Sequence, residues 1–134
     1  MLREINEPDT FEYDPSQAVE LLKEGGIKTE VSYLTFVNVD YNGYVFVGDI
    51  DIDGLPKKKV ETQDARLTAF EVDPAELDRR IPGRYNYLRV VSAPDGHTAI
   101  GFIASTTRGE LQQALSRFRV ITDDCASNLL DMRK

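Results

Sequence analysis

The stretch that decides the fold is IKTEVSYLTFVNV, residues 27–39, in which apolar and polar side chains alternate. A period of two predicts a half-buried β-strand. The segment DYNG follows, and YVFVGDIDI, residues 44–52, is the expected return strand. Asn42-Gly43 is a favoured type I′ turn dipeptide, because both central residues of that turn need a positive φ. The sequence therefore predicts an antiparallel hairpin, and the side chains expected on one side of its first strand are Ile27, Val31, Tyr33, Val37 and Val39.

Further strands complete the predicted sheet. PGRYNYLRVVSA, residues 82–93, and HTAIGFIAS, residues 97–105, flank the turn sequence PDG and predict a second hairpin. A third strand region lies loosely within residues 58–72, after the turn residues DGLP. We expect this strand to pair back onto the first hairpin, which gives about five strands in all.

Two short helices have recognisable start sequences. In DPSQAVELLKEGG, Asp14 is the expected N-cap, Gln17 completes a capping box and Gly25 is the expected left-handed stop. The predicted buried stripe of this helix consists of Ala18, Leu21 and Leu22. DPAELDRRI repeats the pattern, with Asp73 as N-cap and Glu76 closing the box, and predicts a helix over 74–80.

A long amphipathic helix is predicted over residues 108–133. Thr107 and Glu110 form a capping box at its start. Apolar residues then recur at helical spacing, namely Leu111, Ala114, Leu115, Phe118, Ile121, Cys125, Leu129 and Met132. Thr122-Asp123-Asp124 could break and recap the helix, which leaves one helix or two as alternatives. We expect the stripe to pack on the sheet, with a homodimer seam as the alternative.

Together these elements predict a single α+β domain over residues 1–134. Its mostly antiparallel sheet carries helices on one face. Residues 1–13 have no clean period and are expected to form an extended arm or an edge strand. With 41% apolar and 29% charged residues, the chain has the composition of a globular protein.

Charge is unevenly distributed along the chain. The net charge is −7, and residues 1–56 hold 12 acidic and 3 basic residues, a balance of −9. An acidic surface repels phosphate backbones, which argues against general nucleic-acid binding, and it favours encounter with a basic protein partner.

The apolar runs and the cysteine content exclude several further classes. No apolar run approaches 18 residues, so we expect no membrane span. The acidic start lacks the hydrophobic region of a signal peptide. Cys125 is the one cysteine, so neither an internal disulfide nor a thiolate zinc site can form, and a cytoplasmic location is expected.

The stretch DIDIDG, residues 49–54, resembles the start of a calcium loop. Counted from Asp49, however, the position that requires a bidentate carboxylate is Val60, and lysines occupy the three positions before it. Strand alternation explains the run without a metal, and predicts a row of carboxylates from Asp49, Asp51 and Asp53 on a solvated strand face. The row is either neutralised by Lys57–Lys59 across a turn or binds a basic partner.

Residue types suited to catalysis are few. His97 follows a turn, and no serine or cysteine can be assigned to it by motif. Cys125 falls on the apolar stripe of the long helix, where it is expected to act as a small hydrophobic residue. No glycine-rich phosphate loop is present. We therefore predict no catalytic residues, no cofactor and no metal, and favour a non-enzymatic protein.

A cluster of arginines and tyrosines is the second candidate site. Such residues are frequent in binding hot spots and anion sites, and the set comprises Arg79, Arg80, Arg84, Tyr85, Tyr87 and Arg89. Tyr85, Tyr87 and Arg89 are expected to share one strand face. The alternatives are structural: pairing of the arginines with the surplus acids, and packing of the tyrosines in the sheet.

Two functions follow from these observations. The first is an acidic, non-enzymatic protein-binding module of the inhibitor, immunity or adaptor type that docks a basic partner through Asp49, Asp51 and Asp53. The second is a protein, enzymatic or not, that binds a small anionic ligand or nucleotide through the cluster between Arg79 and Arg89.

Overall fold

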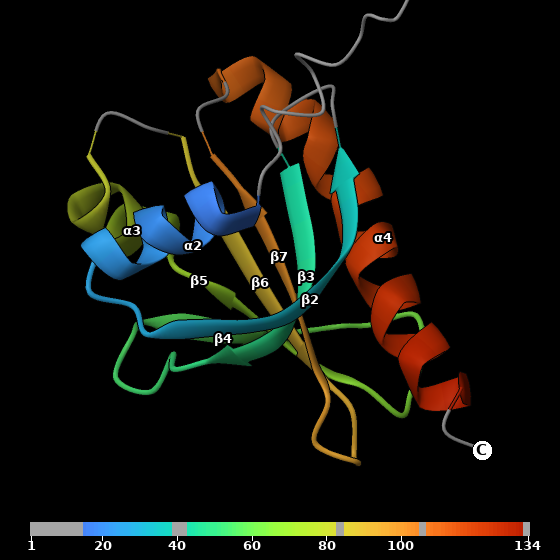
Figure 1. Cartoon of the computed structure of the whole chain (residues 1–134). Helices are drawn as coiled ribbons and strands as arrows, with labels where there is room; N and C mark the ends of the chain where they lie inside the picture. The colour runs from blue at the N-terminus through green and yellow to red at the C-terminus, as the bar shows by residue number, and fades with distance from the viewer. Residues whose placement is uncertain (1–14, 39–42, 83–84, 105–106, 133–134) are drawn as a thin grey trace, which may run out of the picture.

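The computed structural model describes residues 15–38, 43–82, 85–104 and 107–132, which form a single α+β domain (Figure 1). The elements in chain order are α2 (Pro15–Glu24), β2 (Thr29–Asn38), β3 (Gly43–Ile50), β4 (Lys57–Val60), β5 (Thr68–Val72), α3 (Pro74–Arg80), β6 (Tyr87–Ser92), β7 (Thr98–Ile103) and α4 (Arg108–Met132). The predicted fold class is confirmed. The predicted arm, Asp14 and Arg84 lie outside the described residues.

The six strands form one sheet in the order β2-β3-β7-β6-β5-β4, and all neighbouring strands are antiparallel. Both predicted hairpins are present, as β2–β3 and β6–β7. Residues 58–72 contribute two strands rather than one, because residues 61–67 reverse the chain between β4 and β5. β4 pairs with β5 at the edge opposite β2, so the expected pairing with the first hairpin is wrong.

The register of the first hairpin differs from the predicted two-residue turn. Gly43 is the first residue of β3 and pairs with Asn38, so the connection comprises residues 39–42, which are not described. Two register shifts, between Val31 and Tyr33 and between Leu34 and Phe36, interrupt the strict alternation predicted for β2. At Gly48 a Cβ atom would lie 2.0 Å from the Glu30 carbonyl oxygen, so this close approach of the strands requires glycine.

Helices cover both faces of the sheet, so the expectation that they share one face is wrong (Figure 1). Tyr44 and Phe46 of β3 belong to the core that contains Leu22 of α2 and Leu77 of α3. Val45, between them, packs on the other side with Phe118 of α4. Because successive strand residues point to opposite faces, a run of buried residues in β3 needs cover on both sides.

α4 is one continuous helix, and the predicted capping box is confirmed. Glu110 donates its backbone N–H to the Thr107 hydroxyl, and its carboxylate accepts from the Thr107 N–H, both at 3.2 Å. Thr122 does not break the helix, and its buried hydroxyl is satisfied by donating to the Phe118 carbonyl at 2.8 Å. The buried ridge runs through residues four apart, Ala114, Phe118, Thr122 and Ala126. At Gly101 a Cβ would lie 2.6 Å from the Thr122 hydroxyl oxygen, so glycine lets α4 approach β7 closely.

The short helices end and begin differently from the prediction. The left-handed residue after α2 is Gly26, with φ +83°, rather than Gly25, which instead packs against Ile81. Asp73 precedes α3 as predicted, but its side chain makes no capping hydrogen bond. Glu76 does not close a capping box, because its carboxylate accepts hydrogen bonds from Arg79 and Arg80.

Candidate functional site

A row of register partners crosses the sheet under α4. Lys58 pairs with Glu71, Glu71 with Arg89, Arg89 with Gly101, and Gly101 with Val45. Register partners point to the same face, which here is the face that α4 covers. Two ionisable side chains of this row, Glu71 and Arg89, are therefore placed in the core between sheet and helix, with exposed fractions of 5% and 1%.

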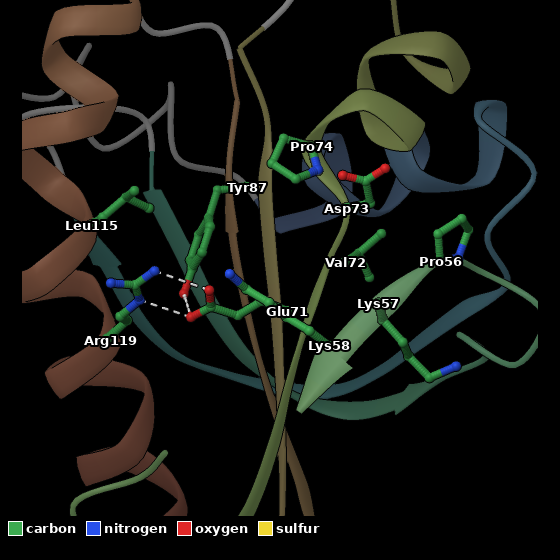
Figure 2. A pocket seen from close by; sticks show the side chains of 10 residues that line it. All are labelled: Pro56, Lys57, Lys58, Glu71, Val72, Asp73, Pro74, Tyr87, Leu115 and Arg119. Carbon is green, nitrogen blue, oxygen red and sulfur yellow. Dashed lines mark hydrogen bonds and ion pairs between the residues drawn. The ribbon is translucent and has the colours of Figure 1, made fainter. Parts of the chain in front are cut away.

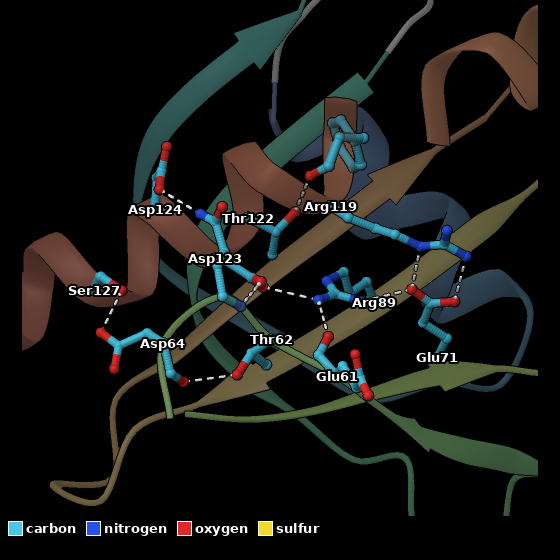
Figure 3. A network of polar contacts seen from close by, with 12 residues as sticks. Glu61, Thr62, Asp64, Glu71, Arg89, Arg119, Thr122, Asp123, Asp124 and Ser127 are labelled. Atoms are coloured by element: carbon cyan, nitrogen blue, oxygen red, sulfur yellow. Dashed lines mark hydrogen bonds and ion pairs between the residues drawn. The ribbon is translucent and has the colours of Figure 1, made fainter. Parts of the chain in front are cut away.

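Arg89 is the centre of a polar network (Figure 3). Its Nη1 donates to the Glu71 carboxylate at 2.5 Å, and its Nη2 donates to Asp123 Oδ1 of α4 at 2.9 Å. Nη2 also donates to the carbonyl of Glu61 at 3.2 Å. Its Nε has no partner among the described residues. A buried charge is costly unless opposite charges lie beside it, and two carboxylates meet that need here.

Glu71 accepts from three side chains. Tyr87 donates its hydroxyl at 2.7 Å, and Arg119 of α4 donates from Nε and Nη2 at 2.8 and 3.0 Å, in addition to Arg89. Burial acts to raise the pKa of Glu71, but the hydrogen bonds from Arg119 and Tyr87 and the two arginine charges outweigh it, so the pKa lies below its ordinary value. Burial, together with the bond to Glu71, raises the pKa of Tyr87. Glu71 is thus held ionised and Tyr87 protonated, and neither is suited to proton transfer near neutrality.

The loop between β4 and β5 is fastened to α4 by polar side chains. The backbone N–H of Gln63 donates to Asp123 at 3.1 Å, and its side-chain amide donates to Asp124 at 2.7 Å. Ser127 donates to Asp64 at 2.8 Å, as Figure 3 shows. The negative charges of Glu71 and Asp123 balance the positive charges of Arg89 and Arg119. Together with the loop contacts, this network holds the loop, the sheet and the helix together.

Two adjoining hollows lie along α4 beside this network. The first encloses about 400 Å³ between α4, β5 and the start of α3, and Glu71, Tyr87 and Arg119 form its inner end (Figure 2). Lys57 and Lys58 also line it, and the ammonium group of Lys57 donates to the carbonyls of Ile52 and Leu55 at 3.2 and 3.4 Å.

The second hollow, which we call the Asn86 hollow, encloses about 410 Å³ between α3, α4 and the segment before β6. Its lining comprises Pro74, Ala75, Asp78, Tyr85, Asn86, Tyr87, Arg108, Leu111, Gln112 and Leu115. The two hollows share Pro74, Tyr87 and Leu115. Both volumes fall within the range of small-molecule sites, roughly 300–1,000 Å³.

The aspartates of the stretch DIDIDG, residues 49–54, do not belong to this network. Asp49 is exposed near the end of β3, but the strand stops at Ile50, so Asp51 and Asp53 lie in the following turn rather than in a strand row. Asp51 Oδ1 accepts from the Asp53 N–H at 3.1 Å. All three are exposed, and none forms an ion pair with a described basic side chain. Among the described residues, no three metal-ligating side chains converge.

Glu30 joins this group through the register of β2 and β3. It is exposed and pairs directly with Asp49. Continued from the Asn38–Gly43 pair without the two register shifts, β2 would pair Glu30 with Asp51, so the shifts select Asp49 as its partner. We call Glu30, Asp49, Asp51 and Asp53 the acidic end. Lys57–Lys59, expected to neutralise it, belong to β4 and pair with β5; the Lys57 ammonium donates to the Ile52 and Leu55 carbonyls of the same turn but forms no ion pair with these carboxylates.

The arginine and tyrosine cluster is not one site. Arg79 and Arg80 bind Glu76, and Arg80 also donates to the Gly25 carbonyl at 3.0 Å. Tyr87 and Arg89 do share a face of β6, but they are buried in the network. Tyr85 precedes the strand and is 41% exposed. The guanidinium carbon of Arg108 lies 5.3 Å from the centroid of its ring.

Sequence reasoning missed the partners that α4 supplies. Arg119 and Asp123 interrupt or adjoin the apolar stripe, yet Asp123 is 3% exposed and binds Arg89. A carboxylate next to the predicted buried ridge of a helix is the sequence signal that could have identified it. Cys125 is half-buried against the apolar clusters under α4, and His97 lies in the β6–β7 turn, where its backbone N–H donates to Asp95 at 3.0 Å.

Comparison with known proteins finds no matching family model, no curated relative and no matching solved structure. In the described part of the chain, no helix combines the length and hydropathy needed to cross a bilayer.

Proposed function

We propose that the chain is a non-enzymatic protein-binding module whose acidic end docks a basic partner protein. The observation that carries the proposal is the direct pairing of Glu30 with Asp49. Like charges opposite each other on adjacent strands destabilise a sheet. A cationic partner surface offsets this repulsion, so docking of the partner also removes an unfavourable electrostatic interaction within the sheet.

The contrast in pairing supports this proposal. The buried acids Glu71 and Asp123 are each bound to arginine, whereas the exposed acids of the acidic end have no described cationic partner within ion-pair distance. Exposed carboxylates of this kind attract a cationic surface over about a Debye length, roughly 8–10 Å at physiological salt. They raise the association rate and contribute to partner choice.

The other predicted partner is a second copy of the chain. The buried ridge of α4 packs on its own sheet, so a homodimer through this helix would have to use the outer face. Among the described side chains of that face, Val120 is the large hydrophobic one with substantial exposure, at 42%. A single exposed valine is a weak basis for a stable interface, and we favour a different, basic partner, with a cytoplasmic location as predicted from the sequence.

Affinity capture from the native host with two charge-matched variants tests the proposal. The first variant carries D49N, D51N and D53N. The control carries E61Q, D78N and D95N, which change the net charge equally at exposed positions outside the acidic end. We expect basic proteins to be retained by wild type and by the control and lost with the first variant, and their affinity to fall with rising salt. Equal retention by both variants, or salt-independent binding, contradicts the proposal.

A further inference from the structure

The Asn86 hollow contains a buried acceptor without a described partner. Asn86 is 5% exposed, and its Nδ2 donates to the Ile81 carbonyl at 3.2 Å, while its Oδ1 accepts no hydrogen bond from the described residues. A buried amide oxygen without a hydrogen bond is unfavourable, so a ligand group that donates to it is bound more tightly. The oxygen is closed to solvent, so a donor reaches it only when a neighbouring side chain moves.

Opposite charges line the same hollow. Arg108, at the start of α4, lies over the Tyr85 ring and has no carboxylate within ion-pair distance among the described residues. Asp78 of α3 is exposed, and no described basic group pairs with it. One cation and one anion therefore face a single hollow without neutralising each other.

The remaining lining is largely apolar. Pro74, Ala75, Leu111, Leu115 and the ring of Tyr87 supply the surface between the charged groups. The volume of about 410 Å³ exceeds that of any single amino-acid side chain and suits a small ligand with one bulky apolar group. A net anion such as a nucleotide would meet Asp78, and a net cation would meet Arg108, so neither complements the whole hollow.

We propose that the Asn86 hollow binds a small zwitterion of the amino-acid class that carries a large apolar side chain. The ligand carboxylate pairs with the Arg108 guanidinium, whose planar fork matches it. The ammonium group donates to Asn86 Oδ1 and to the Asp78 carboxylate, and the side chain packs against Leu111 and Leu115. This site does not rest on the proposed function, because the acidic end belongs to β2, β3 and the turn after β3, and the hollow does not.

Titration of ¹⁵N-labelled protein with L-phenylalanine, L-tryptophan and L-leucine tests the site by NMR. We expect saturable shifts of the Asn86 side-chain amide with at least one of them, at a dissociation constant of about millimolar or tighter for ligands of this size. N-acetylphenylalanine and phenylalaninamide, which each lack one charge, should bind at least about tenfold more weakly than phenylalanine if both charges are used.

Variants on α4 and α3 make the test specific. R108Q and D78N should each weaken binding about tenfold or more. R117Q, at an exposed α4 position outside the hollow, should leave it unchanged. The proposal is overturned if none of the three amino acids, at up to about 10 mM, shifts the NMR signals of the Asn86 side-chain amide. It is also overturned if the singly charged analogues bind as tightly as phenylalanine, or if R108Q and R117Q have the same affinity for it.

Discussion

Two groups of carboxylates in this chain have the same chemistry and opposite surroundings. Glu71 and Asp123 are 5% and 3% exposed and are each bound to arginine, together with hydroxyl or backbone donors. Asp49, Asp51 and Asp53 are exposed and have no described cationic partner within ion-pair distance. Burial makes a partner obligatory, because an ion in a low-dielectric interior is strongly destabilised, while water solvates the exposed group. The buried group thus shapes the fold, and the exposed group remains accessible to a second molecule.

Removal of Arg89 should have the largest effect. R89M leaves Glu71 and Asp123 with fewer cationic partners in the core, so we expect a loss of about 3–5 kcal/mol in the free energy of unfolding, measured by urea denaturation. R119M should cost less, roughly 1 kcal/mol, because Arg119 is 42% exposed. Equal losses in the two variants would show that depth of burial does not set the cost.

The contact of α4 with the sheet should be the next most sensitive feature. A Cβ atom at Gly101 would lie 2.6 Å from the Thr122 hydroxyl oxygen and 2.9 Å from the Phe118 ring. G101A therefore forces α4 away from the network, and we expect a loss of about 1–3 kcal/mol by thermal or urea denaturation. G109A, at a position with open space around the added Cβ, is the matched control and should not destabilise the protein.

Acidification should remove the stabilisation that Glu71 contributes. The folded pKa of Glu71 lies below its ordinary value of 4.5, so its contribution to stability is full above that value and is lost as the pH falls through the folded pKa. Urea midpoints measured from pH 7 to about pH 3 should therefore fall less steeply in E71Q than in wild type. If the urea midpoints of E71Q and wild type fall equally steeply with pH, Glu71 does not contribute to the destabilisation by acid.

Neutralisation of the acidic end should affect stability least. D49N, D51N and D53N together should change the free energy of unfolding by no more than roughly 0.5 kcal/mol per site. The side chains are exposed, and the amide oxygen introduced by D51N can still accept the hydrogen bond of the turn from the backbone N–H of residue 53. A small gain is expected because Glu30 no longer faces a charge. A large loss in the free energy of unfolding would mean that these aspartates stabilise the fold, and it would contradict their assignment to partner binding.

Local patterns were sufficient for most of the elements. The Thr107 and Glu110 capping box is made as predicted, since both partners lie within one helical turn. The strands of both hairpins follow from short-range signals in the same way, whereas the helix over 74–80 forms as predicted without the capping hydrogen bonds on which its prediction rested. The placement of helices on both faces was missed, although the unbroken apolar run of β3 was its sequence counterpart.

Long-range contacts were not predictable in this way. The partners of Arg89 come from β5 and α4, 18 and 34 residues away, and no local pattern specifies which acid reaches which arginine. The pairing of Glu30 with Asp49 depends on register shifts that hydrophobic alternation does not encode. Neither site hypothesis from the sequence therefore specified the geometry of its residues.

The fastening of the β4–β5 loop to α4 has a consequence for biosynthesis. Contacts such as Gln63 with Asp123 and Arg66 with Asp131 join segments 60 and 65 residues apart. During translation every described strand emerges before the helix that covers Val45, Ala69, Val91 and Ile103. A ribosome-bound chain that has not yet exposed α4 therefore presents one apolar side of its sheet to solvent, and chaperones have their main opportunity to bind it in that interval.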